Sequence, residues 1–232
     1  VSAYGLAMAV ARRLADAHGK ALWLEEFGAT HSVFGEEEVA EWARRVAIEA
    51  RLHGASHLGW WCGLDFREEL AEVAPYRHHP HELSFGMLRA DRSPRPVAQA
   101  LREAARAPLE MPKRVGLLIP SYAYRAYPFS ERPSGVLQRA LLNAYAALRQ
   151  MGYLPEAVLE EDLVAAGDGG GPAGSVDDEV GRRVGELPSV LVAPAVQKLL
   201  APTWDRLARY PGRVIYSYLH GTAVRSHEGG WV

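Results

Sequence analysis

A short apolar segment that ends in two carboxylates constrains the fold of this chain more than any other feature. The segment runs from Ala21 to Gly28 and reads Ala-Leu-Trp-Leu-Glu-Glu-Phe-Gly. It is short and shows no alternation of apolar and polar residues, which is typical of a strand buried on both faces of a parallel sheet. Because a carboxylate without partners is costly to bury, we expect Glu25 and Glu26 where the strand end opens onto a polar site. Both acids are therefore candidates for chemistry.

Helical and strand patterns alternate around this segment. Apolar residues at helical spacing predict helices over residues 3–17, 36–53 and 96–106, and a second apolar run predicts a strand over 57–62. This order is that of a parallel α/β fold, with two of its strands present. A (β/α)8 barrel needs roughly 200 residues or more, so a barrel would be represented here by its last quarter to third.

A proline-containing break at residues 108–112 predicts a linker, and a second α/β pattern follows it. Strands are expected at 113–120, 158–159, 188–194 and 213–218, with helices at 135–151 and 202–210. The predicted fold class is therefore α/β, with the last part of a (β/α)8 barrel over 1–107 and an open flavodoxin-like domain over 113–232. The glycine-rich segment 167–175 is expected to be a surface loop, because no strand precedes it and no Lys-Ser/Thr pair follows.

Composition and charge favour a neutral or mildly polar ligand. The chain has 232 residues, a formal net charge of −2 and a pI near 6.5, which gives no reason to expect nucleic acid or a membrane as partner. No apolar run approaches the roughly 18 residues of a membrane span. The single cysteine, Cys62, excludes an internal disulfide and favours the cytoplasm. Because the chain opens at Val1 without Met, we expect that the native start, with any targeting signal, is missing.

Several ordered motifs resemble retaining β-glycosidases of the cellulase and β-mannanase type, glycoside hydrolase family five. The segment Trp23–Gly28 resembles that family's strand seven, which ends in Glu-Phe-Gly, and Gly54-Ala55 followed by Trp61 resembles strand eight, which ends in a tryptophan beside the sugar. Further pieces resemble the family's closing loop and the entry into helix eight: Pro75-Tyr76, Glu82, Phe85-Gly86-Met87 and Asp91–Pro96. The resemblance covers about residues 1–106.

The second half resembles the flavodoxin-like trimerisation domain of β-galactosidases of family forty-two, through residues 115–120, 142–145 and 190–194. This resemblance implies a possible homo-oligomer through the second domain. Class I glutamine amidotransferases share such a fold, but their chemistry needs a nucleophilic cysteine after a strand of the sheet. Because Cys62 lies in the other domain, we expect the second domain to be catalytically silent.

The family resemblance assigns roles to individual residues. It implies that Glu26 is the nucleophile of a retaining mechanism, in which two carboxyl groups lie about 5 to 5.5 Å apart. The residues alone leave Glu25 and Glu26 equally open, and the motif decides for Glu26. The family's acid/base residue lies at the end of strand four, which this chain does not contain, so no residue here is assigned that role.

Substrate-binding candidates come from the aromatic and histidine residues near the strand ends. Of Trp60 and Trp61, one is expected in the core because neighbouring strand residues face opposite sides, and Trp61 is favoured as the one that stacks on a sugar. His31 and Tyr76 are further candidates for the cleft. The histidines at 78, 79 and 81 lack the spacing of a zinc site, so neither a metal nor a cofactor is expected.

The sequence is compatible with three functions. The first is a glycosidase acting on a carbohydrate substrate such as a β-linked mannan or glucan, with a β-galactosidase-like exo-glycosidase as its nearest variant. The second is a noncatalytic carbohydrate-binding or assembly protein on a barrel scaffold. The third, an amidotransferase or other hydrolase in the second domain, is disfavoured by the absence of a cysteine there. The isolated chain is expected to be inactive, because most of the barrel is missing.

Overall fold

The computed structural model describes residues 1–124, 135–165, 187–194, 196, 198–217 and 223–225. The glycine-rich segment 167–175 lies outside these residues. The chain divides into two compact units. The first comprises Val1, Ala3–Ala15 and Gly19–Met111, and the second comprises Ser2, Asp16–His18 and Pro112–Val232.

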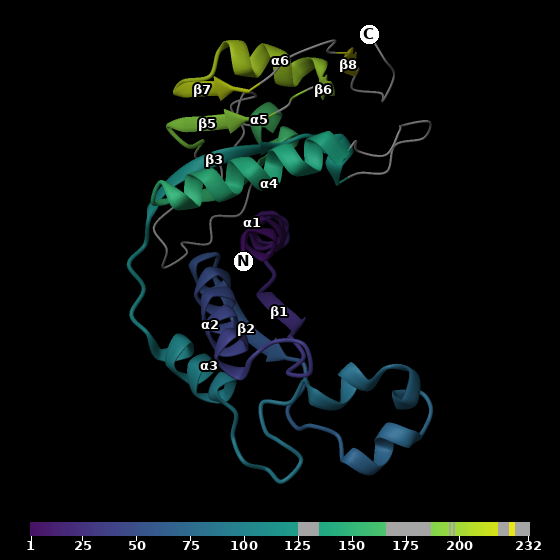
Figure 1. Ribbon diagram of the computed structural model, residues 1–232. Coiled ribbons are helices and arrows are strands. Elements are labelled where there is room, and N and C mark those ends of the chain that lie inside the picture. Colours follow the sequence, from purple (N-terminus) through teal and green to yellow (C-terminus); the bar gives the residue numbers. More distant parts are fainter. Residues whose placement is uncertain (125–134, 166–186, 195, 197, 218–222, 226–232) are drawn as a thin grey trace. The chain divides into compact units, whose positions relative to one another are not determined.

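The first unit contains a pair of parallel strands and three helices (Figure 1). In chain order these are α1 (Ser2–Ala17), β1 (Leu22–Phe27), α2 (Glu36–Leu52), β2 (Ala55–Trp60) and α3 (Pro96–Arg106). Three short 3-10 turns lie between β2 and α3: η1 (Glu68–Glu72), η2 (Tyr76–His78) and η3 (Pro80–Ser84). The predicted alternation of helices with parallel strands is confirmed.

Local interactions determine where helix α2 begins and ends. Three glutamates fill its first turn, where they complement the helix dipole, and the Glu38 carboxylate accepts the Gly35 N–H at 3.1 Å. The helix ends at Leu52, followed by Gly54 with φ of 76°. A left-handed residue at this point favours glycine because other side chains are strained there.

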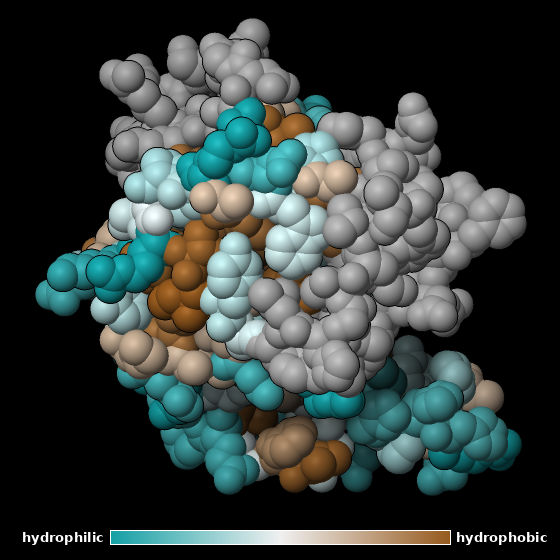
Figure 2. Space-filling view, turned by 90° about the horizontal axis from the view of Figure 1, so that it is seen from above, coloured by the Kyte–Doolittle hydropathy of each residue, from teal (hydrophilic) through white to brown (hydrophobic). Residues whose placement is uncertain are grey.

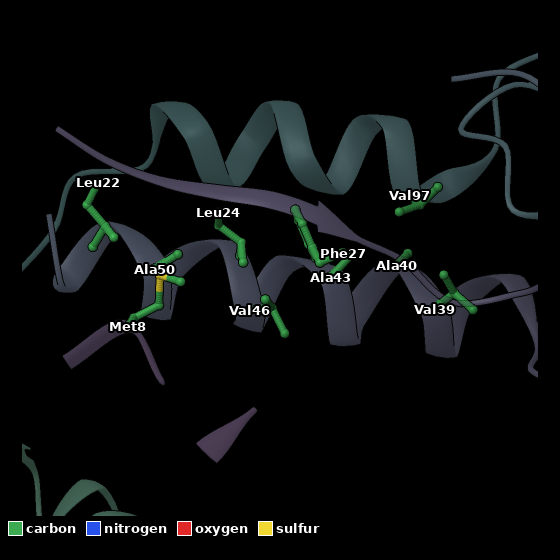
Figure 3. Packing of buried hydrophobic residues seen from close by; sticks show 10 residues of the cluster. All are labelled: Met8, Leu22, Leu24, Phe27, Val39, Ala40, Ala43, Val46, Ala50 and Val97. Carbon is green, nitrogen blue, oxygen red and sulfur yellow. The ribbon is translucent and has the colours of Figure 1, made fainter. Parts of the chain in front are cut away.

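The core of the first unit lies between β1 and α2 (Figure 3). Leu22, Leu24 and Phe27 of β1 pack against the buried stripe of α2, which includes Ala43 and Val46. Figure 3 also shows that α1 contributes Met8 and α3 contributes Val97 to the same cluster.

The expectation that β1 is buried on both faces is wrong. Trp23 is 59% exposed and Glu25 is exposed, whereas Leu22, Leu24 and Phe27 are buried. The sequence lacks alternation because Trp23, on the uncovered face, is itself apolar. Its ring packs on that of His57 from β2, with 4.3 Å between the ring centroids.

The second unit contains a four-stranded sheet, in which every strand is parallel to its neighbours in the order β4-β3-β5-β7. The strands are β3 (Lys113–Ile119), β4 (Tyr153–Leu159), β5 (Val190–Ala193) and β7 (Arg213–Tyr216). Its other elements are η4 (Ser121–Ala123), α4 (Gly135–Gln150), α5 (Glu160–Ala165), β6 (Lys198–Leu200), α6 (Ala201–Ala208) and β8 (Ala223–Arg225). Leu117 and Leu118 point to opposite faces of β3 and are both fully buried, so both faces of this strand are covered.

Strand β4 is longer than the two residues predicted for it. The prediction fell short because Pro155 argues against a central strand, but β4 lies at one end of the strand order, where proline is tolerated. The short elements α5, β6 and β8 were not predicted, since segments of three to six residues carry too little periodicity.

On the face shown in Figure 2, hydrophobic residues are exposed among hydrophilic ones.

Within the described part of the chain, no helix is long and apolar enough to cross a bilayer. The same residues contain no group of three or more histidine, cysteine, aspartate or glutamate side chains placed to hold a metal ion.

Candidate active site

The end of β1 carries a β-bulge that contains both candidate acids. Leu24 pairs with Leu58 and Phe27 pairs with Trp60, so β1 advances three residues where β2 advances two. The extra residue has its backbone in the left-handed region, with a φ of 47° at Glu26. A bulge of this kind re-aims side chains near the end of a strand.

The bulge decides which face of the sheet Glu26 occupies. Strict alternation after Leu22 and Leu24 would place Glu26 on the core face, beside α2. Burying that carboxylate among apolar side chains would cost several kcal/mol, whereas a left-handed non-glycine residue costs roughly 1–3 kcal/mol. With the bulge, Glu25 and Glu26 are both exposed, and Phe27 takes the core position instead.

Gly59 is the residue of β2 that faces the bulge. A Cβ atom on Gly59 would lie 3.5 Å from the Glu26 nitrogen and 3.8 Å from the Glu25 Cα. These are ordinary van der Waals distances, so Gly59 lies directly beside the backbone of the two acids. Backbone strain at a polar strand end is typical of functional sites, so the bulge marks this place as a candidate active site.

The two tryptophans at the end of β2 have different environments. Trp60 packs in an aromatic cluster, with its ring centroid 5.3 Å from that of Phe27 and 6.1 Å from that of Trp42. Its indole N–H donates to the Phe85 carbonyl at 2.8 Å. Trp61 is 43% exposed, and its backbone N–H donates to the Phe27 carbonyl at 2.9 Å. Of these two tryptophans, Trp61 is therefore the exposed one.

Gly28 holds Trp61 next to the end of β1. A Cβ atom on Gly28 would lie 2.3 Å from the Trp61 carbonyl oxygen, so only glycine allows this approach of the two backbones. The peptide bond between Trp61 and Cys62 is cis. The Glu-Phe-Gly motif thus provides a carboxylate at the bulge, an aromatic ring in the core and a glycine where the two backbones come close together.

Hydrogen bonds connect the loop after β1 to the loop before α3. The Thr30 hydroxyl donates to the His81 carbonyl at 2.9 Å, and the His31 N–H donates to the Ser84 carbonyl at 2.8 Å. Both ring nitrogens of His31 are buried, and no hydrogen-bond partner for them lies within the described parts of the chain. Burial, followed by the positive charge of Arg95, holds the pKa of His31 below its ordinary value of 6.5. The predicted role of His31 in substrate binding remains a prediction.

A network of ion pairs connects several segments at this end of the first unit. It was not predicted from the sequence. Arg95 donates to the Asp65 carboxylate at 2.5 Å and also pairs with Glu36, the first residue of α2. Arg89 pairs with the same glutamate at 2.5 Å. Asp65 also accepts the Gly86 N–H at 2.7 Å. The only sequence signal was the position of Arg95 between two prolines.

The remaining predicted residues lie in the loop between β2 and α3. Tyr76 belongs to η2, and its ring centroid lies 4.8 Å from that of Phe66. The rings of His79 and His81 meet edge to face at 5.8 Å, and Nε2 of His81 lies 3.5 Å from Glu82. The structure therefore brings Glu26 and Trp61 to the ends of neighbouring strands and places Tyr76 in the long loop. Their roles remain predictions.

The fold is that of a parallel α/β chain, and it is similar to the folds of glycoside hydrolases of known structure. A GH5_18 enzyme from Streptomyces cattleya, solved in complex with GlcNAc, is 26% identical, with a TM-score of 0.50 over 72% of this chain and 41% of that chain. A structure of GH5_18 from the same organism in complex with Manβ1-4GlcNAc is 23% identical, with a TM-score of 0.51 over 93% and 44% of the two chains. An exo-β-1,4-mannosidase from Opitutaceae bacterium strain TAV5 is 17% identical, with a TM-score of 0.57 over 84% and 32%.

These likenesses support an α/β fold of the glycoside hydrolase kind. The chain spans less than half the length of each of these enzymes. No protein-family model matches the sequence, and no curated protein sequence matches it.

Proposed function

We propose that this chain is part of a retaining β-glycosidase in which Glu26 is the nucleophile. The observation that carries the proposal is the bulge at the end of β1, which turns Glu26 away from the core at the cost of a left-handed backbone. The exposed ring of Trp61 at the end of the paired strand supplies an aromatic face for a sugar. The solved structures of glycoside hydrolases with the same fold support this reaction class.

The proposed mechanism has two displacement steps. The Glu26 carboxylate attacks the anomeric carbon while a second carboxyl group protonates the leaving oxygen, which gives a covalent glycosyl-enzyme. Water activated by the second group then releases the sugar and restores the Glu26 carboxylate. We assign the second carboxyl group to polypeptide outside this chain, together with the other strands that a (β/α)8 barrel needs. Glu25 then has no catalytic role.

A β-linked mannoside is the substrate class that we favour. Two of the similar structures carry names that point to it, an exo-β-1,4-mannosidase and a GH5_18 structure in complex with Manβ1-4GlcNAc. We propose that Trp61 stacks on the sugar beside Glu26. A β-glucan or β-galactoside substrate is the alternative within the same mechanism.

We further propose that residues 113–232 form a flavodoxin-like domain with a role in assembly. The strand order β4-β3-β5-β7 corresponds to the order 2-1-3-4 that begins a flavodoxin-like sheet. Light scattering on the purified protein tests this role. A monomer at all concentrations would contradict it.

The test of the nucleophile uses the full-length protein that contains this chain, assayed with aryl β-mannosides, β-glucosides and β-galactosides. Glu26→Ala and Glu26→Gln should lower kcat by at least about 1,000-fold, equivalent to about 4 kcal/mol of transition-state stabilisation. Azide should partly restore turnover of the Glu26→Ala variant by taking the place of the carboxylate. Glu25→Ala and Glu25→Gln are matched controls, because they alter the neighbouring acid of the same bulge.

A covalent label separates the two acids directly. An activated 2-fluoro glycoside should leave its sugar on Glu26, as peptide mass spectrometry would show. A label on Glu25, or full activity of the Glu26→Gln variant, would overturn the assignment. Sugar binding without turnover by the wild-type protein would instead favour a noncatalytic carbohydrate-binding function.

A further inference from the structure

The second unit contains a carboxylate that is fully buried at the carboxyl edge of its sheet. Glu160 directly follows β4 and has no exposed surface. One carboxylate oxygen accepts the Ser121 N–H at 2.5 Å, and the other accepts the Leu200 N–H at 2.7 Å. Ser121 lies just beyond the end of β3, and Leu200 is the N-cap of α6. A single side chain therefore joins three separate segments at one edge of the unit.

The charge of Glu160 is met by backbone donors. Within the described parts of the chain, no lysine, arginine or histidine side chain forms an ion pair with this carboxylate. Burying a carboxylate without partners is costly, and hydrogen bonds from backbone N–H groups are the usual way to stabilise it. Backbone N–H groups that converge on one negative group are also how proteins bind oxyanions from solution.

The position of Glu160 is one where open α/β sheets bind ligands. The chain passes from β3 to β4 on one side and then returns to β5 on the other side of β3. Ligands of such sheets bind outside the carboxyl ends of the strands, where the strand order reverses. Ser121 follows β3 at this reversal, and its N–H donates to Glu160 rather than to an external group.

Further buried hydroxyl groups lie in η4 and α6, the segments to which Glu160 is hydrogen-bonded. Among the residues that the structure describes, the hydroxyl oxygens of Ser121, Tyr122 and Thr203 are buried and find no hydrogen-bond partner. Ser121 and Thr203 have no exposed surface, and Tyr122 is 7% exposed. Glu160 connects to these residues through its bonds to Ser121 and to Leu200, which lies three residues before Thr203. Because most buried polar side-chain atoms in proteins have a partner, these hydroxyl groups need an explanation.

We propose that the carboxyl edge of the second unit is an oxyanion site whose permanent occupant is the chain's own Glu160 carboxylate. The site is therefore closed to phosphate and nucleotide ligands in the wild-type protein. If the side chain is removed, the N–H donors of Ser121 and Leu200 remain, and a small carboxylate from solution takes its place. Acetate matches the atoms that Glu160→Ala removes, whereas inorganic phosphate is larger and carries more charge.

The test is chemical rescue of the Glu160→Ala variant, followed by thermal unfolding. Loss of two hydrogen bonds to a charged group should lower Tm by roughly 10 °C. Sodium acetate should raise Tm in a saturable way, as expected for a ligand that binds only the folded state, and sodium chloride at equal ionic strength should not. Glu161→Ala is the matched control, because its carboxylate is adjacent in sequence but accepts from the Tyr124 hydroxyl instead. Wild type and this control should respond equally to acetate and chloride.

Several results would overturn the proposal. A folded Glu160→Ala variant that responds to acetate no more than to chloride would do so, as would equal rescue of Glu161→Ala. Stronger rescue by inorganic phosphate than by acetate would contradict a site sized for a carboxylate. A variant that folds only with acetate present would support the proposal.

A second measurement serves if Glu160→Ala does not fold under any condition. In the wild-type protein the Ser121 and Leu200 amides should be protected from hydrogen exchange, and both amide resonances should shift in Glu160→Gln. Unprotected amides in the wild type would overturn the proposal without any variant.

Discussion

Substitution of Arg95 should strongly destabilise the first unit, because it leaves the buried Asp65 carboxylate without a positively charged partner. The side chains of Arg95 and Asp65 are only 11% and 7% exposed, and their charged atoms lie 2.5 Å apart. Breaking a buried pair by removing one partner costs roughly 3–5 kcal/mol, whereas the more exposed pair with Glu36 adds at most about 1 kcal/mol. We therefore expect Arg95→Met to lower the free energy of unfolding by roughly 3–5 kcal/mol. Urea unfolding followed by tryptophan fluorescence measures this change.

Two further variants test the physical reason for that loss. Asp65→Asn in the Arg95→Met background removes the stranded charge but keeps an oxygen for the Gly86 N–H, so the double variant should be more stable than Arg95→Met alone. Arg45→Met is the matched control, because Arg45 is 63% exposed and pairs with Glu41 on the surface of α2. A loss below about 1 kcal/mol for Arg95→Met, or further destabilisation by Asp65→Asn, would refute the argument from buried charge.

Two predictions concern the ends of the strands. Gly28→Ala should lower the free energy of unfolding of the first unit by about 1–3 kcal/mol, because the added Cβ would lie 2.3 Å from the Trp61 carbonyl oxygen. Gly63→Ala is the control, because a Cβ at Gly63 would have no atom within 4 Å, and it should be close to neutral. Urea unfolding measures both changes. Burial and the charge of Arg95 lower the pKa of His31 in the folded state, so the unfolded state binds the proton more tightly. The free energy of unfolding should therefore be highest above pH 6.5 and fall as the pH drops below this value. His31→Gln should flatten that dependence between pH 8 and 5, and an unchanged slope would contradict it.

The elements with strong periodicity could be predicted from sequence. The apolar stripe of α2 and the proline that starts α3 gave bounds within about one residue of those in the structure. Most of strand β4 was not predicted, because Pro155 is unusual in a strand other than one at the edge of a sheet. The elements α5, β6 and β8 are too short to show a pattern. The exposure of Trp23 was missed for a different reason, since an apolar residue on an uncovered face looks the same in sequence as a buried one.

The candidate site was only partly visible in the sequence. The Glu-Phe-Gly motif indicated an acid at a strand end, but the choice between Glu25 and Glu26 rested on resemblance alone. The network around Arg95 and the buried carboxylate of Glu160 could not be predicted, because their partners lie 30 or more residues away in the chain.

The sequence by itself determined the parallel α/β class, the main helices and the place where acids follow an apolar strand. These properties depend on local periodicity and on residue types, which a linear sequence displays directly. Tertiary structure alone decided that one extra residue turns Glu26 away from the core and that the Glu160 carboxylate accepts backbone N–H groups from two distant segments. Strand register and burial depend on contacts between distant segments, so they exist only once those segments have come together.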